Sequence, residues 1–357
     1  MNVVAATKKY EGWARKRIAI VEADLKLKHR AMAAAAFPFL RATFYRWVEL
    51  SREACPELQD APHLLAVGDL HLENFGTWRD AEGRLAWGIN DFDEAYPMPY
   101  ALDLLRLATS VLLAVREQKL SLGGEAACKQ LLDGYRAGMA GDGQGFILEE
   151  AHPLLRAMAL GEERDPVHFW ARLTALQAVE PPRQVRQLLR KQLPARKAAF
   201  RVVHRTVGLG SLGRQRFVAL GECLGGLVAR EAKAVLPSAY GWASGEKDKK
   251  TYIDAILENA IRAPDPFMLV RKGWLLRRLA PHCTRIEIGD YPGRRDEAHL
   301  LHAMGREAAN VHWGSRDAIA AVRRDLQRRA AGWLFGAAQR MAAATLADWE
   351  AWRKAQG

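Results

Sequence analysis

The segment from residue 63 to residue 93 constrains the fold of this chain more than any other, because short strands alternate there with acidic loops. Apolar runs of strand length, bounded by polar turns, predict strands over 63–67, 74–78 and 85–90. The polar turn 79–84 would join the last two into a tight hairpin. The polar side chains at the strand ends are Asp69, Asn74, Asp91 and Asp93. We expect them to converge on one cleft, where their hard oxygen atoms suit magnesium.

The spacing of these residues is typical of phosphoryl transfer. Asn74 follows Asp69 by five positions, as in the catalytic loop of kinases, and Asp91 precedes a phenylalanine, as in their metal-binding loop. The reaction needs a carboxylate that orients the acceptor hydroxyl and metal ions that neutralise the phosphates. We therefore predict the catalytic residues Asp69, His71 and Asn74, with Asp69 as the base, and the metal ligands Asn74, Asp91 and Asp93. Alternatively, these residues cap strands and turns, and His71 braces its loop.

The string GDLHLEN at residues 68–74 resembles the GDLHxxN loop of aminoglycoside phosphotransferases and choline kinases. NDFDEA at residues 90–95 resembles their metal-binding segment, and Asp103 resembles the aspartate that braces their catalytic loop. Those enzymes have His directly before the Gly-Asp pair, whereas this chain has Val67. Together with DLLRLATS and VGLGSLG, these strings resemble the bacterial domain-of-unknown-function family 2252 over most of the chain. The resemblance implies a kinase-like two-lobed fold that binds ATP and Mg²⁺ and acts on a small molecule.

A glycine-rich turn with the pattern GxGxxG follows much later in the chain. Backbone amides in such a turn can cradle phosphates, which assigns nucleotide binding to Gly208, Gly210, Ser211 and Gly213. The flanking sequence from about 200 to 234 is typical of an antiparallel β-module, and its charged residues suit a solvent-facing hairpin and a kinase-like flap. A dinucleotide site is the alternative, since Glu231 lies about where a ribose-binding acid would stand.

The strand after this turn should present the cation that pairs with the nucleotide phosphates. Arg230 and Lys233 are both candidates, and their odd spacing places them on opposite faces of a strand. The family often has Lys-Glu-Ala where this chain has Arg230-Glu231-Ala232, which favours Arg230, whereas kinase chemistry favours Lys233. Both residues therefore remain assigned to nucleotide binding.

The order of these parts differs from that of ordinary kinases, in which the glycine flap precedes the catalytic loop. Here Gly208 follows Asp69 by more than a hundred positions, so we predict two lobes in circularly permuted order. Helical periodicity with a break at Pro38 predicts two or three helices before the first strand. The fold class is thus predicted as α+β and mostly helical. The predicted parts are a catalytic helical lobe over 1–197, a glycine-rich β-module over 198–290 and, over 291–357, C-terminal helices that pack on the catalytic lobe.

Composition adds only broad limits. The 357 residues include 53 Lys or Arg against 41 Asp or Glu, and the net charge of +12 favours anionic partners. The charge is spread over helical stretches, without a zinc knuckle, an aromatic RNA-binding signature or a basic stripe, so a nucleic-acid partner is not expected. Four scattered cysteines indicate reduced thiols. Because the sequence shows no apolar signal core and no apolar run of spanning length, we expect a cytoplasmic protein without a membrane partner.

The sequence thus favours an enzyme that moves the γ-phosphoryl group of ATP to a hydroxyl of a small molecule, with Mg²⁺ as cofactor. Two alternatives stay open, namely a non-catalytic nucleotide sensor and an enzyme that transfers AMP with the same metal site. Arg41, Arg277 and Arg278 are expected to pair with carboxylates rather than with phosphate. His302 and His312 show no metal-ligand pattern. The sequence identifies neither the acceptor nor the oligomeric state.

Overall fold

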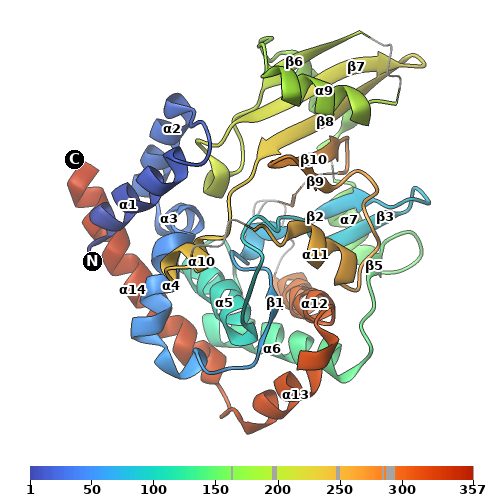
Figure 1. Cartoon of the computed structure of the whole chain (residues 1–357). Coiled ribbons are helices and arrows are strands. Elements are labelled where there is room, and N and C mark those ends of the chain that lie inside the picture. The colour runs from blue at the N-terminus through green and yellow to red at the C-terminus, as the bar shows by residue number, and fades with distance from the viewer. Residues whose placement is uncertain (162–163, 195–198, 247–249, 284, 287–293, 357) are drawn as a thin grey trace.

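The chain combines many helices with small antiparallel sheets, which confirms the predicted α+β class. The computed structural model describes residues 1–161, 164–194, 199–246, 250–283, 285–286 and 294–356. Figure 1 shows a helical body with a sheet module above it. The helical body comprises 1–159, 239–259 and 294–356, and the sheet module comprises 166–194, 199–234 and 269–279.

Four helices begin the helical body, rather than the predicted two or three. They are α1 (Val3–Arg15), α2 (Glu22–Ala34), α3 (Ala36–Ala42) and α4 (Phe44–Ala54). The predicted break at Pro38 is wrong, because Pro38 lies in the first turn of α3, where a missing N–H leaves no helical hydrogen bond unmade. The chain breaks instead at Ala35, whose backbone is extended.

The predicted hairpin is confirmed. Its strands are β2 (Phe75–Arg79) and β3 (Leu85–Ile89), and Thr77 pairs with Trp87 at the centre of the register. A third strand, β5 (Phe146–Ile147), extends this sheet. The predicted strand before the hairpin is also present, as β1 (His63–Ala66), and it pairs with β4 (Tyr96–Pro99). The ends of β1, β2, β3 and β4 bring both acidic loops to one place.

Further helices, five to 24 residues long, form the rest of the helical body. They are α5 (Tyr100–Arg116), α6 (Gly124–Ala140), α7 (Pro153–Ala159), α10 (Ala239–Ala243), α11 (Ile253–Asn259), α12 (Arg294–His312), α13 (Ile319–Arg328) and α14 (Trp333–Gln356). Glycines let α6 and α12 pack closely: a Cβ on Gly134 would lie 1.9 Å from the His302 carbonyl oxygen, and one on Gly305 would lie 2.0 Å from that of Leu131. This contact fixes α12 against the centre of the body.

The last helix lies against the first ones. Trp352 of α14 is buried in a cluster with Val3, Met32 and Phe39, and Arg46 of α4 donates a 2.7 Å hydrogen bond to Asp348 of α14. Figure 1 shows both ends of the chain on the same side of the molecule. The helical body is therefore assembled from segments at opposite ends of the sequence.

The sheet module confirms the antiparallel β-structure predicted over 200–234. Its five strands have the spatial order β6-β7-β8-β10-β9. Their bounds are β6 (Phe200–His204), β7 (Arg216–Cys223), β8 (Gly226–Ala234), β9 (Leu269–Arg271) and β10 (Trp274–Leu279). One face packs against Phe169 and Leu173 of α8 (Pro166–Thr174), and the other against Val185 and Leu189 of α9 (Arg183–Gln192). Burial of these apolar side chains attaches α8 and α9 to the sheet.

Both of these helices precede the lobe boundary predicted between 197 and 198. That boundary, like the one between 290 and 291, lies outside the described residues. In the part of the chain that the structure covers, no helix has the length and apolar character needed to cross a membrane.

Candidate functional site

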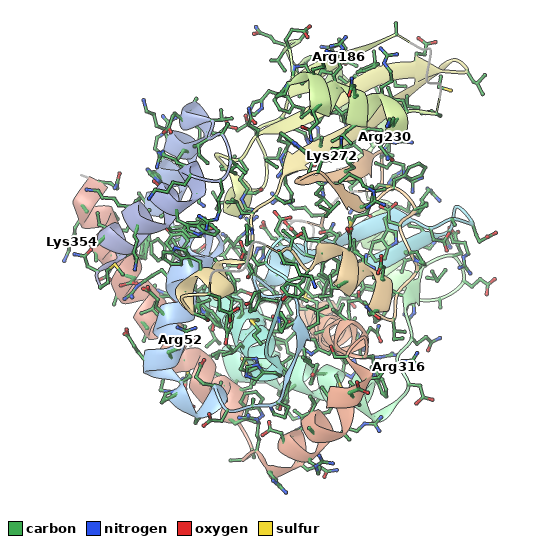
Figure 2. The ribbon with its side chains drawn as sticks, viewed as in Figure 1. Arg52, Arg186, Arg230, Lys272, Arg316 and Lys354 are labelled. Carbon is green, nitrogen blue, oxygen red and sulfur yellow. The ribbon has the colours of Figure 1, made fainter. Side chains whose placement is uncertain are left out.

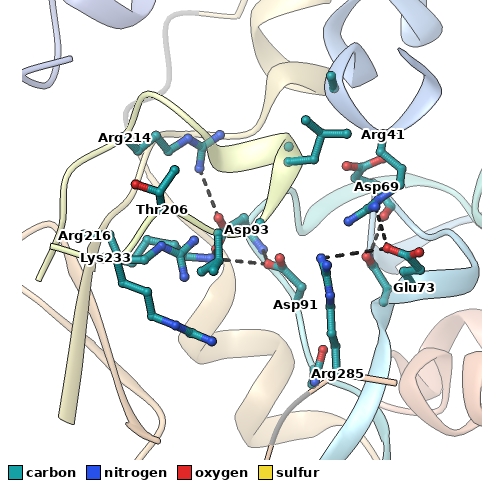
Figure 3. A pocket seen from close by; sticks show the side chains of 18 of the residues that line it. Arg41, Asp69, Glu73, Asp91, Asp93, Thr206, Arg214, Arg216, Lys233 and Arg285 are labelled. Carbon is teal, nitrogen blue, oxygen red and sulfur yellow. Dashed lines mark hydrogen bonds and ion pairs between the residues drawn. The ribbon is translucent and has the colours of Figure 1, made fainter. Parts of the chain in front are cut away.

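A cleft of about 560 Å³ lies between the sheet module and the helical body. Most of the predicted site residues line it, and Figure 3 shows several of them facing one another across it. The predicted residues in its lining are Asp69, His71, Asn74, Asp91, Asp93, Gly208, Gly210 and Lys233. The acidic loops and the glycine-rich turn, which are more than a hundred positions apart in the sequence, therefore meet in this cleft.

Asp69, the predicted base, lies in the loop after β1, and its side chain is 17% exposed. Its Oδ1 atom accepts a 2.9 Å hydrogen bond from Arg106 Nε and a second one from Arg106 Nη2. Its Oδ2 atom lies toward Gly210, where a Cβ on the glycine would be 3.6 Å away. Burial raises the pKa of Asp69 although Arg106 lies beside it. One oxygen is thus fixed by an arginine while the other faces the glycine-rich turn.

The loop around Asp69 is held by its own residues. Asn74 ends the short 3-10 helix η2 (Leu72–Asn74), and its Nδ2 donates a 2.6 Å hydrogen bond to the Asp69 carbonyl. His71 caps the start of η2, since its Nδ1 accepts a hydrogen bond from the Glu73 amide at 3.1 Å. Burial and the nearby Arg41 and Arg106 lower the pKa of His71 well below its usual range, so the ring is neutral. His71 thus contributes to holding the loop, and its catalytic role stays a prediction.

Asp103 of α5 holds the backbone of the Asp69 loop in place. Its two oxygens accept hydrogen bonds from the backbone amides of Val67 and Gly68, at 2.7 and 2.8 Å. His312 donates from Nε2 to Asp103 Oδ2 at 2.9 Å, and its Nδ1 lies 2.8 Å from the hydroxyl of Tyr135. All three polar side chains are buried. His312 thus has a positioning role that the sequence did not indicate.

Asp91 and Asp93 follow β3 and differ in their surroundings. Asp91 is 45% exposed, and its Oδ1 lies 3.6 Å from Lys233 Nζ. Desolvation opposes ionisation of Asp91, but Lys233 and Arg277 outweigh it and lower the pKa to about 2. Asp93 is only 9% exposed and lies between two cations, 2.7 Å from Lys233 Nζ and 3.1 Å from Arg214 Nη1. Asp91 is therefore an ionised carboxylate open to the cleft, whereas Asp93 is held in ion pairs.

The residues that could hold magnesium are Asn74 and Asp91. The Asn74 amide donates through Nδ2, which leaves its carbonyl oxygen as a ligand, and Asp91 is ionised and exposed. Among the described residues, no three His, Cys, Asp or Glu side chains are grouped to hold a metal ion. Mg²⁺ is commonly bound through one or two carboxylates together with substrate phosphates, so two protein ligands fit it. The predicted third ligand, Asp93, is engaged by Lys233 and Arg214.

The structure distinguishes between the two candidate cations on β8. Lys233 lies in the cleft beside Asp91 and Asp93. Arg230 points to the other face of the sheet, where it donates to the carbonyl of Gln192 at 2.9 Å and lies over the ring of Phe267. The alternation of side chains along a strand accounts for this difference. The assignment of Arg230 to nucleotide binding is therefore corrected.

Glu231 does not occupy the position of a ribose-binding acid. Its side chain is fully buried and shared by three arginines of the cleft, with Arg277 Nε at 2.6 Å, Arg216 Nη1 at 2.9 Å and Arg205 Nη1 at 3.2 Å. These arginines hold the pKa of Glu231 well below its usual range despite its burial. The strand β7 follows the glycine-rich turn, where a dinucleotide site would need a helix. The dinucleotide alternative is therefore wrong.

The glycine-rich turn is anchored to α2. Lys28 Nζ donates a 3.0 Å hydrogen bond to the Gly210 carbonyl, and Asp24 accepts from His204 at 2.7 Å and from Thr206 at 3.1 Å. Of the four predicted residues, Gly208 and Gly210 line the cleft. Ser211 is instead buried, and its hydroxyl accepts a hydrogen bond from Arg216 at 2.8 Å.

The expectation of a solvent-facing hairpin around this turn is also wrong. Arg214 and Arg216 are buried in ion pairs, because carboxylates of β8 and of the loop after β3 lie opposite them. Gly213 packs beside Leu25 of α2. The turn is thus a fixed part of the cleft wall.

The remaining arginines behave largely as predicted. Arg41 of α3 pairs with Glu73, and Arg277 pairs with Glu231. Arg278 differs, since it donates to the carbonyl of Arg79 at 2.6 Å. Sequence reasoning missed Arg106, although a lone cation within an apolar helix is a sign of a buried ion pair.

Comparison with known proteins gives one match. A family model described as "Uncharacterized protein conserved in bacteria (DUF2252)" matches residues 17–166, which include both acidic loops and Asp103 but neither the glycine-rich turn nor β8. Neither the curated proteins nor the solved structures gave a match. Over residues 17–166 the chain is therefore similar to the bacterial DUF2252 proteins.

Proposed function

We propose that the protein is an ATP- and Mg²⁺-dependent phosphotransferase that acts on a hydroxyl group, with a kinase-like fold whose two lobes are joined in permuted order. The observation that carries the proposal is the meeting of Asp69, Asn74 and Asp91 with Lys233 in one cleft, although these residues come from distant parts of the sequence. A carboxylate base, two oxygen ligands and a phosphate-binding cation are the parts that phosphoryl transfer requires.

The proposal gives each residue a role. Asp69 Oδ2 accepts the proton of the acceptor hydroxyl, and Arg106 on Oδ1 fixes the orientation of the carboxylate. Asn74 and Asp91 hold Mg²⁺, which neutralises charge on the phosphates when it is bound. Asp103 keeps the backbone of the catalytic loop in place through the amides of Val67 and Gly68.

The phosphates would lie on the sheet side of the cleft. Lys233 lies there beside three arginines that share the single carboxylate of Glu231, so this part of the lining carries excess positive charge. Charge-assisted hydrogen bonds from guanidinium groups bind phosphate oxygens strongly. Glu231 and the aspartates neutralise these cations only in part, and the negative charge of a bound polyphosphate would neutralise the rest.

The test uses ATP labelled separately on the α- and γ-phosphates, with Mg²⁺ and a metabolite extract. Wild type should transfer the γ-label, whereas Asp69→Asn should bind ATP and lose about 10²- to 10⁴-fold in transfer rate. Asp91→Asn should lose Mg²⁺-dependent ATP binding. Asp60→Asn, at an exposed position before β1, is the control and should behave as wild type.

The position of the transferred label distinguishes a phosphotransferase from an AMP-transferring enzyme and from a nucleotide sensor. Transfer of the α-label would replace phosphotransfer with AMP transfer. Mg²⁺-dependent binding without transfer of either label would indicate a nucleotide sensor. Failure of wild type to bind ATP with Mg²⁺ would reject all three.

A further inference from the structure

The charge of the cleft lining bears on the acceptor. Among the residues that the structure describes, ten Lys or Arg residues line the cleft, against five Asp or Glu residues. The five carboxylates are Asp69, Glu73, Asp91, Asp93 and Glu94. Glu231 lies behind three of these arginines, and even with its charge included the described residues of the cleft carry a net positive charge, which favours anions over cations.

Each of the five carboxylates is already paired. Asp69 is bound by Arg106, and Asp91 by Lys233. Asp93 lies between Lys233 and Arg214, and Glu94 accepts from Arg214 Nη2 at 3.2 Å. Glu73 contacts Arg41 and, at 3.8 Å, Arg285. Every carboxylate of this lining thus already has a cation beside it, and an anionic acceptor would bring the sign of charge that is in the minority among these residues.

The cations fall into two groups. Lys233 and the arginines around Glu231 lie on the sheet side, where the proposed phosphates are placed. Arg41 and Arg285 lie on the helical-body side of the cleft. Both contact Glu73, which belongs to the same loop as Asp69. Figure 3 shows Arg285 reaching up between Asp91 and Glu73. Arg285 is 33% exposed, so a bound molecule can touch it.

We propose that the acceptor is a small anion that carries a hydroxyl group, and that Arg41 and Arg285 bind its phosphate or carboxylate. This inference rests on the proposed phosphotransfer. The acceptor oxygen would form a bond to the γ-phosphorus of ATP, the bond from that phosphorus to the β,γ-bridging oxygen would break, and the hydroxyl proton would pass to Asp69. The products are ADP and an acceptor that carries one additional phosphate.

The test separates a metabolite extract by ion exchange into anionic, neutral and cationic fractions. Each fraction is incubated with the protein, Mg²⁺ and γ-labelled ATP. Labelling of a compound from the anionic fraction supports the inference, and labelling from the neutral or cationic fraction overturns it while leaving phosphotransfer intact. If the wild-type protein does not bind ATP in the presence of Mg²⁺, the proposed function itself is rejected.

Arg285→Gln tests the assigned residue. It should raise KM for the anionic acceptor by about 10- to 100-fold and leave KM for ATP within a factor of two, because one charge-assisted contact is lost. Arg285→Lys should restore part of the affinity. The control Arg324→Gln makes the same charge change at an exposed position of α13, and an equal rise of KM there would overturn the assignment.

A binding experiment decides the case in which no fraction is labelled. The protein is saturated with Mg²⁺ and the non-hydrolysable analogue AMP-PNP and titrated by calorimetry with 3-phosphoglycerate and with choline. Binding of 3-phosphoglycerate that weakens 10- to 100-fold in Arg285→Gln supports the inference. Binding of choline, or no binding of 3-phosphoglycerate, overturns it.

Discussion

Gly68 lies directly against the carbonyl oxygen of Glu94, and a Cβ atom at Gly68 would stand 2.2 Å from that oxygen. Gly68 also has a φ of +90°, in the region that favours glycine. This contact joins the loop that carries Asp69 to the loop that carries Asp91. The relative position of the base and the metal ligand thus depends on a residue without a side chain.

Gly68→Ala should lower the free energy of unfolding by about 2–5 kcal/mol, since it adds a steric clash to an unfavourable φ. Gly83→Ala is a matched control, because Gly83 has a similar φ of +78° but open space around its Cα. It should lose only about 1 kcal/mol. Chemical denaturation of both variants measures the difference, and equal losses would show that the contact with Glu94 does not matter.

Asp103→Asn should lower the free energy of unfolding by about 2–4 kcal/mol and reduce any turnover. The substitution leaves one of the buried amides of Val67 and Gly68, or the His312 ring, without an acceptor. Asp142→Asn changes an exposed aspartate and serves as the control. A loss below about 1 kcal/mol, measured by urea denaturation, would contradict the bracing role of Asp103.

Glu307 should make the stability pH-dependent. It is buried against β3, and burial raises its pKa to about 7 from 4.5. The folded protein therefore binds this proton more tightly than the unfolded chain does. The resulting stabilisation is complete below pH 4.5 and is lost as the pH rises through about 7, with a size of about 3 kcal/mol.

Glu307→Gln removes this titration. The free energy of unfolding of the variant, relative to wild type, should therefore rise by about 3 kcal/mol between pH 4.5 and pH 8. Glu82→Gln, at an exposed position in the β2–β3 turn, should keep a constant difference from wild type. A pH-independent difference for Glu307→Gln, in denaturation series at several pH values, would show that Glu307 does not titrate as stated.

Lys233→Met should raise the Kd for ATP with Mg²⁺ by about 10- to 100-fold, because it removes a cation of the cleft. Arg230→Met, three positions earlier on the opposite face of β8, should leave this Kd within a factor of two. Calorimetric titration of the folded variants with ATP and Mg²⁺ compares them. The reverse order would restore Arg230 as the phosphate-binding residue.

Local patterns explain what the sequence could predict. The hairpin of β2 and β3 follows from two apolar runs around a polar turn, and together with the apolar run of β1 they fix where Asp69, Asn74 and Asp91 stand. The two-residue alternation of a strand also predicted that Arg230 and Lys233 would lie on opposite faces. Such inferences need only neighbours in the sequence.

Partners that are distant in the sequence account for what was missed. Arg106 binds Asp69 from 37 positions away, and Arg214 reaches Asp93 across 121 positions. The periodicity of the sequence cannot predict such contacts, because they depend on how the helical body and the sheet module pack against each other. The charged turn after β6 was wrongly predicted to face solvent for the same reason, since the carboxylates that pair with its arginines come from other elements.

The position of α14 has a consequence for how the chain folds. Arg46 and Asp348, which join α4 to α14, are 302 positions apart, so part of the core of the helical body forms through contacts of very high sequence separation. Chains with high contact order fold slowly and keep apolar surface exposed for longer. During synthesis, the apolar faces of α1 to α4 that α14 covers stay exposed until α14 has emerged from the ribosome. These faces are the surfaces that a chaperone would protect.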